Sequence, residues 1–446
     1  MSIGRTKAEA LAKDVLAPKA VADVVDVLTS GKPLPFSIQT DASNKGNRKM
    51  SLAVQYFRPE TGIYNKMLDF GENADEKSKK ICGQGNCHAH IVHNTVKHAL
   101  DQLSVDVENV VLKVYGHFST SAKRRESLKD FCNFCDVEFR EILRHVTTRW
   151  LSLNPAISRL MQSWTALRSY FISLGEECPR QIRALLKLSE ASTEEDADNV
   201  EVYLLFSNNI LSLFEDVVKK LENDSTTCVE LYSIMSTFKQ KLTQRRDDQF
   251  YGYLTKTGQG EISEFLNTAI SYIEKWFDFS EDNWLFSLQP LSLHHGMLSF
   301  SDTEIITNKL NLIQKVSMDE LYDECTTANS ILKGLREGAD DEWKSKDVAA
   351  RWVALFQVAN LPNMLSIISH ILSIPASTGY VERIFSRMSN KWSDSRNRCS
   401  VELIRSELLI TLNFEQSCSE FYWICLKDKQ LLSAARSDKK YTYKRK

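Results

Sequence analysis

The periodicity of apolar residues changes once along this chain, and that change limits what it can fold into. Three short segments near the N-terminus, residues 36–40, 52–57 and 63–70, are strand-like and are separated by turns. After residue 77 the strand pattern stops, and from Cys87 to Trp343 apolar side chains recur with helical spacing. We therefore expect two hairpins in series, an antiparallel meander, within a protein that is mostly helical. Helical runs are predicted at residues 1–30, 137–143, 157–174, 200–221 and 265–277.

Composition excludes several classes of protein. The chain has 446 residues, of which 43% are hydrophobic and 26% are charged, as in an ordinary globular protein. Its formal net charge of -2 provides no global field toward nucleic acid, so any such contact must come from local patches. Ten scattered cysteines without a signal peptide indicate a reducing compartment inside the cell. Polar residues interrupt the longest apolar runs, so we expect no membrane span.

Glu382 is the residue that most needs an explanation. It lies in an apolar, helix-like run that follows the start signal from Pro375 to Gly379. A carboxylate in apolar surroundings is costly unless it is paired or binds a metal. Arg383 follows Glu382 directly in the sequence.

Asp41 is a candidate metal ligand because it follows the first predicted strand. Carboxylates at strand ends hold two cations in many phosphoryl-transfer sites. The sequence Asp-Ala-Ser-Asn also forms an ordinary turn, and from the residues alone the turn is the favoured interpretation.

Cys87 and His90 supply the ligand types that zinc uses. However, the chain has no Cys pair and His pair at zinc-finger spacing. Packing at a strand-to-helix junction is therefore favoured over zinc binding. We assign Cys87 and His90 a structural role.

Arg149 and Trp150 combine a fork-shaped donor with a large flat ring. This pair suits phosphate contact and base stacking, so both are candidate DNA-binding residues. It suits cation–π packing in a core equally well.

Taken together, these features resemble the hAT superfamily of cut-and-paste DNA transposases and the host proteins derived from them. The resemblance is carried by Asp41, the Cys-x-x-His of Cys87 and His90, the Arg149-Trp150 pair, and above all residues 374–386, 394–398 and 401–412. It covers nearly the whole chain. Many family members use an N-terminal zinc-finger module that is not seen here, so we expect Met1 to be an internal start within a longer ancestor.

The resemblance implies an α/β fold that is mostly helical overall, with an incomplete RNase H-like core interrupted by a large all-helical insertion. We expect an N-terminal helical segment (1–33), the first part of the core (34–150), the insertion (151–342), the C-terminal dimerisation region that completes the core (343–416), and a C-terminal helix with a basic tail (417–446).

Family catalysis uses two Asp and one Glu to bind divalent metal, so the implied cofactor of an active protein is Mg²⁺ or Mn²⁺. By position, Asp41 would be the first acid and Glu382 the third. The second acid is missing from its place, because the residues between the third strand and Cys87 are too few for a crossover helix, a strand and another helix. Asp69 and Asp75 lie nearby, on the third strand or its exit turn. Two carboxylates should hold two metals poorly.

We therefore expect a transposase-derived protein that is catalytically inactive, forms a homodimer through its C-terminal region and has DNA as a candidate partner. The alternative is an active metal-dependent transposase using Asp41, a substitute acid and Glu382. A nuclear location is expected, with the cytoplasm as the alternative. The apolar helix face of Val401, Ile404, Leu408 and Leu412 meets the second copy, closes the chain's own core, or does both. The expected dimerisation residues are Trp352, Ile384, Phe385, Val401, Ile404, Leu408 and Leu412.

Overall fold

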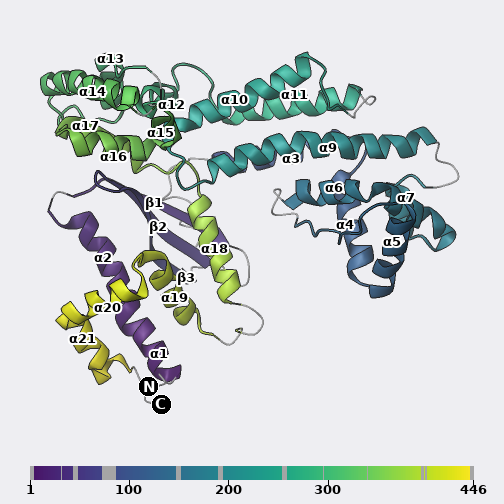
Figure 1. Ribbon diagram of the computed structural model, residues 1–446, viewed down its shortest axis with the longest axis horizontal. Helices are drawn as coiled ribbons and strands as arrows, with labels where there is room; N and C mark the ends of the chain where they lie inside the picture. Colours follow the sequence, from purple (N-terminus) through teal and green to yellow (C-terminus); the bar gives the residue numbers. More distant parts are fainter. Residues whose placement is uncertain are drawn as a thin grey trace. The chain divides into compact units, whose positions relative to one another are not determined.

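The computed structural model is mostly helical and divides into two compact units (Figure 1). The first unit comprises residues 1–87, 221–232 and 281–446, and the second comprises residues 88–220 and 233–280. The structure describes residues 5–31, 33–43, 49–72, 87–146, 152–188, 194–253, 259–294, 296–338, 340–392, 396 and 399–441.

A three-stranded antiparallel meander, in the order β1-β2-β3, lies in the first unit. The strands are β1 (Phe36–Ser43), β2 (Lys49–Arg58) and β3 (Gly62–Glu72), so all three predicted strands are confirmed. Gly62 opens β3 with a φ of 106°, a value that few other residues adopt, which explains the glycine in this tight turn. The described residues contain no further strand of a mixed sheet, and the RNase H-like core stays a prediction.

The sequence predicted that Asp41 lies just past the end of the first strand. In the structure it lies within β1, where it is paired with Ser51 of β2. The strand continues through Asp41 to Ser43, because the antiparallel ladder with β2 supplies partners for the backbone of these residues. The turn interpretation of Asp41 was therefore wrong.

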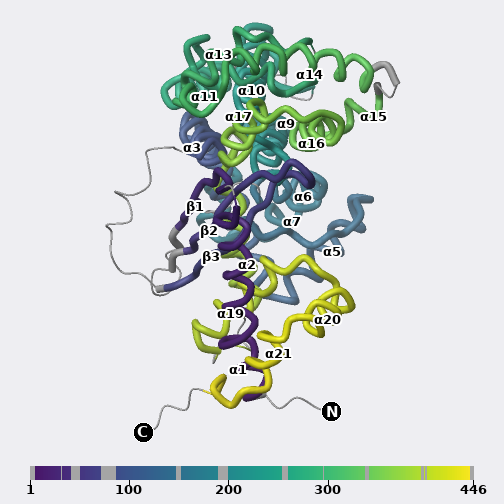
Figure 2. Tube along the Cα trace, turned by 90° about the vertical axis from the view of Figure 1, so that its left-hand side faces the viewer, coloured from purple at the N-terminus to yellow at the C-terminus, as the bar shows by residue number. Residues whose placement is uncertain are grey.

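Helices cover both faces of the meander. The first unit contains α1 (Arg5–Leu11) and α2 (Ala17–Thr29), joined by a π-turn, and the C-terminal helices α16 (Val348–Val358), α17 (Pro362–Leu372), α18 (Gly379–Lys391), α19 (Val401–Asn413), α20 (Cys418–Lys427) and α21 (Lys429–Arg436). Val24 and Leu28 of α2 pack on one face, whereas apolar residues of α18 and α19 pack on the other together with Ala17 at the start of α2 (Figure 1). Figure 2 shows α19 beside α2, in agreement with their contacts.

The end of α19 is hydrogen-bonded directly to the sheet. The Asn413 side chain accepts a bond from Met67 N (2.9 Å) and donates one to Met67 O (2.8 Å). The amide thus satisfies a backbone donor and a backbone acceptor of β3. These groups need such a partner because, among the described residues, no further strand pairs with the outer edge of β3. Four more helices complete the first unit: α12 (Trp284–Ser287), α13 (Phe300–Lys309), α14 (Met318–Gly338) and α15 (Asp340–Ser345).

The second unit is built from helices. They are α3 (His88–Leu100), α4 (Val107–Ser119), α5 (Ala122–Phe134), α6 (Leu153–Gln162), α7 (Trp164–Ser173), α8 (Arg180–Leu185), α9 (Glu194–Leu221), α10 (Cys228–Asp247) and α11 (Gln259–Trp276), with α10 beginning in the first unit. The prediction of a helix at residues 137–143 was wrong: Asp136 has a φ of 54°, and Val137 N donates to Cys132 O, which closes α5. Nowhere among the described residues is a helix both long and apolar enough to cross a membrane.

Candidate functional site

The start of α18 is held tightly by a neighbouring loop of the first unit. Pro375 forms an isolated antiparallel bridge with Thr227. A Cβ at Gly379 would lie 3.1 Å from Ser377 Oγ and 3.3 Å from the Cα of Glu222, so any larger residue would crowd the loop. The glycine at this helix start therefore permits the close approach of two chain segments.

Glu382 lies in the first turn of α18 and is half-buried. Its Oε1 accepts a hydrogen bond from Thr378 Oγ1 (3.0 Å), and its place near a helix N-terminus is favourable for an anion. The buried side chains of α18 include Val381 and Ile384, which point into the core and leave Glu382 on another face of the helix. The structure thus lowers the cost of a charge here.

Arg383, which follows Glu382 in the sequence, is bound to a neighbouring loop. Its NH1 donates to Glu222 O (2.8 Å), and its NH2 forms an ion pair with Asp224. These contacts tie α18 to residues 221–232 of the same unit. Arg383 therefore anchors the helix.

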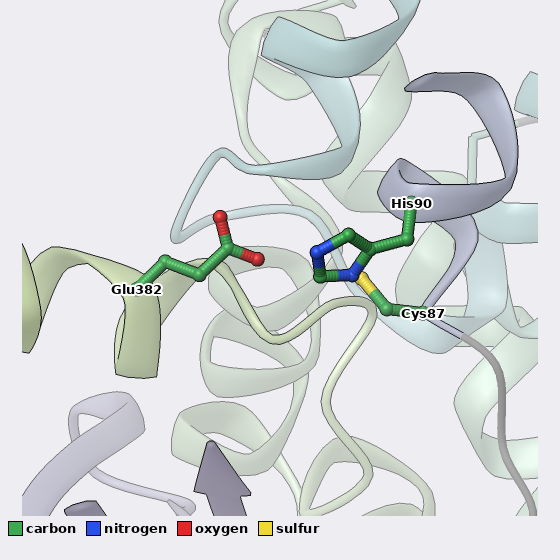
Figure 3. Close-up of side chains that lie close together, drawn as sticks. All are labelled: Cys87, His90 and Glu382. Carbon is green, nitrogen blue, oxygen red and sulfur yellow. The ribbon is translucent and has the colours of Figure 1, made fainter. Parts of the chain in front are cut away.

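Cys87 is the second member of the site (Figure 3). Its Sγ accepts a hydrogen bond from Thr378 N (3.5 Å) and lies within 4.8 Å of a carboxylate oxygen of Glu382. Thr378 therefore contacts both groups, one through its backbone and the other through its hydroxyl. Cys87 also immediately precedes α3, where helix amides favour negative charge on the sulfur.

His90 is held beside Cys87 by the chain itself, because only two residues separate them and His90 lies in the first turn of α3. The His90 side chain is exposed and Cys87 is half-buried. Solvent therefore reaches this group.

Cys87 and Glu382, both in the first unit, offer a sulfur and an oxygen ligand. Within the part of the chain that the structure describes, Asp41 belongs to no group of three or more side chains placed to share a metal. Mg²⁺ demands oxygen ligands in octahedral geometry, whereas thiolate and imidazole are ligands of zinc. The neighbours of Glu382 therefore do not fit the Mg²⁺ site that the sequence implied.

The substitute acids are placed differently. Asp69 forms an ion pair with Arg405 Nε (2.7 Å) and accepts a hydrogen bond from Phe70 N. The strand register puts Phe70, and not Asp69, level with Ser51 and Asp41. Asp75 lies outside the described residues, as do both DNA-binding candidates, Arg149 and Trp150.

Most of the expected dimerisation residues lie inside the chain's own core. Four of them are fully buried within this single chain, and such side chains cannot touch a second copy while the fold is intact. Phe385, Val401 and Leu412 are half-buried and pack against the same core. The structure therefore favours the interpretation that this apolar face closes the chain's own fold. The fully buried four are Trp352, Ile384, Ile404 and Leu408.

Thr378 is the site residue that sequence reasoning missed. Its only sequence signal is its position four residues before Glu382, at the start of a predicted helix. Nothing in the sequence indicates its contact with Cys87, because that contact depends on the tertiary fold.

Comparison with known proteins gives one family match. Residues 338–411, which contain α15 to α18 and most of α19, match the hAT family C-terminal dimerisation region. No curated protein matches the chain.

Proposed function

We propose that the chain is a transposase-derived protein of the hAT family that pairs with a second copy of itself and does not cut DNA, and the match at residues 338–411 supports this proposal. The match to a dimerisation region is the single observation that carries this proposal. The expected self-association is assigned to residues 338–411. The expected absence of DNA cutting rests on the surroundings of Asp41, Asp69 and Glu382 described above.

Self-association must use exposed side chains of the C-terminal region, because its large apolar residues are buried in the core. Val358, at the end of α16, is the clearest example, with 63% of its surface exposed. An exposed β-branched residue at a helix end can be buried by a partner without disturbing the core.

Light scattering after size-exclusion chromatography tests the pairing. We expect a particle of twice the 51.0 kDa chain mass at micromolar concentration. Two differently tagged copies should also co-purify when expressed together. A particle of single-chain mass at every concentration, with no co-purification, would refute self-association.

The absence of cutting is supported by the surroundings of Glu382. A two-metal mechanism needs carboxylates that converge on a pair of cations. Glu382 instead has Thr378 and Cys87 as neighbours, and Asp69 is paired with Arg405. We expect no Mn²⁺-dependent nicking of supercoiled DNA above background, and no difference between the wild type and Glu382→Gln.

The alternative function is an active metal-dependent transposase. Its supporting observation is that both Asp41, on β1, and Glu382, on α18, are present on elements packed together in the first unit. Nicking that requires Mn²⁺ and disappears in both Asp41→Asn and Glu382→Gln would establish this alternative and refute the inactive protein.

DNA contact through Arg149 and Trp150, with a nuclear location, is part of the proposal. Phosphate contacts release counterions, so DNA affinity should fall steeply as salt rises. Arg149→Ala should reduce that salt dependence, and Trp150→Ala should weaken binding to single strands. An affinity that is independent of salt would exclude this mode of binding.

A further inference from the structure

We propose that a cavity in the second unit binds a small, uncharged aromatic molecule: a single ring that carries a hydroxyl or a carboxamide group. The cavity lies between α4, α5 and residues 139–142, which follow α5, and its volume is about 140 Å³. All the residues that line it belong to the second unit. The inference goes beyond the proposed function, because it involves neither the C-terminal region nor DNA.

The cavity arises because the chain turns sharply after α5. Asp136 has a φ of 54°, and the residues that follow it do not continue the helix. They contribute Phe139, Glu141 and Ile142 to the wall of the cavity. Arg159 of α6 holds this wall, since its NH1 donates a hydrogen bond to Glu141 O (2.9 Å). The cavity is therefore bounded on one side by a segment that is tied to a neighbouring helix.

The buried part of the wall is apolar. Phe118, Leu128 and Ile142 are buried, and the half-buried Tyr115 and Phe139 add two more rings. A dry cavity of about 150 Å³ lined by side chains of this kind holds one benzene molecule. The volume here therefore suits one six-membered ring, to which the aromatic side chains offer favourable edge or face contacts.

The exposed part of the wall is polar and determines which ring is preferred. It consists of Ser119, Arg125 and Glu141. Arg125 NH1 lies 3.7 Å from Glu141 Oε1, too far for a hydrogen bond, so a ligand can bond to both groups. A hydroxyl or a carboxamide both donates and accepts, as this pair requires. A carboxylate on the ring would be repelled by Glu141 and an ammonium group by Arg125, so charged rings should bind more weakly.

Titration of the full-length protein with para-fluorophenol, followed by fluorine NMR, is the direct test. This phenol is uncharged at neutral pH, and we expect one molecule to bind per chain in a saturable manner. Ile142→Phe places an additional ring in the cavity and should abolish binding. The matched control is Leu143→Phe, at a more exposed residue that does not line the cavity, and it should bind as the wild type does. Both variants should keep the helical circular dichroism of the wild type.

Charged ligands test the polar part of the wall. The wild type should bind para-fluorobenzoate and para-fluorobenzylamine about fivefold more weakly than para-fluorophenol. Glu141→Gln changes an exposed side chain and should raise the affinity for the benzoate by about fivefold, with little change for the phenol. Absence of saturable binding in the wild type, or equal binding in a folded Ile142→Phe variant, would overturn the proposal. A benzoate affinity that is unchanged in Glu141→Gln would overturn the assigned class of ligand. None of these results bears on the test of self-association.

Discussion

His117 makes the second unit sensitive to mild acid. It lies on α4 with 7% of its surface exposed, and its Nε2 is hydrogen-bonded to Tyr170 OH at 3.0 Å. The rings of Phe118 and Phe171 pack against it. Burial, and secondarily the charge of Arg124, lower the pKa of His117 from 6.5 to about 4.

The direction of the effect follows from proton linkage. The unfolded chain takes up a proton on His117 near pH 6.5, whereas the folded unit resists it until about pH 4. The stabilising contribution is therefore complete above pH 6.5 and is lost as the pH falls toward 4. From pH 7.5 to pH 5, the area between the proton-binding curves of the unfolded and folded states is about 1.5 pH units. The free energy of unfolding therefore falls by about 2 kcal/mol over this range.

Urea denaturation at pH 7.5 and pH 5, followed by circular dichroism, measures this loss. The variant His117→Phe keeps an aromatic ring among the neighbouring rings and has no titrating group. It should be less stable at pH 7.5, because Tyr170 loses a partner, but its stability should fall by about 2 kcal/mol less than that of the wild type on going to pH 5. Equal pH dependence in the two proteins would refute the reasoning.

Two predictions concern the first unit, and both are measured by chemical denaturation. Leu408→Ala removes a fully buried side chain of α19 and should lower the free energy of unfolding by about 2–5 kcal/mol. The control Leu426→Ala, at a residue 46% exposed, should change this free energy little. Equal effects of the two substitutions would show that α19 does not pack as described. Asn413→Leu leaves Met67 N and O without this partner and should cost about 1–3 kcal/mol, and a neutral result would mean that water replaces the amide.

Local patterns in the sequence predicted the elements of the fold better than their ends. The strands at 36–40, 52–57 and 63–70 were found because each has apolar and β-branched residues between turns. The extension of β1 through Asp41 was missed, because a polar stretch becomes a strand only when a neighbour supplies its hydrogen bonds. Likewise, residues 137–143 have helical spacing but no helix, since Asp136 ends α5 and redirects the chain.

The candidate site was predicted only in part. Glu382 and the Cys-x-x-His were each recognised from the sequence, but nothing there brought them together. The proximity of Glu382 and Cys87 depends on Thr378, which contacts Cys87 although the two residues are 291 positions apart in the sequence. Periodicity carries information about neighbours within an element and none about such long-range contacts.

The placement of Glu382 on α18 makes its chemistry separable from its fold. Val381 and Ile384 fasten the helix to the sheet, and Arg383 fastens it to residues 222–224, while Glu382 contacts none of these anchors among the interactions described above. Because side chains one residue apart on a helix point about 100° away from each other, a change at 382 leaves the packed face intact. Glu382→Gln therefore reports on the carboxylate alone. A loss of Mn²⁺-dependent nicking in this variant without loss of stability would identify Glu382 as a catalyst, and unchanged activity would show that the carboxylate is not used.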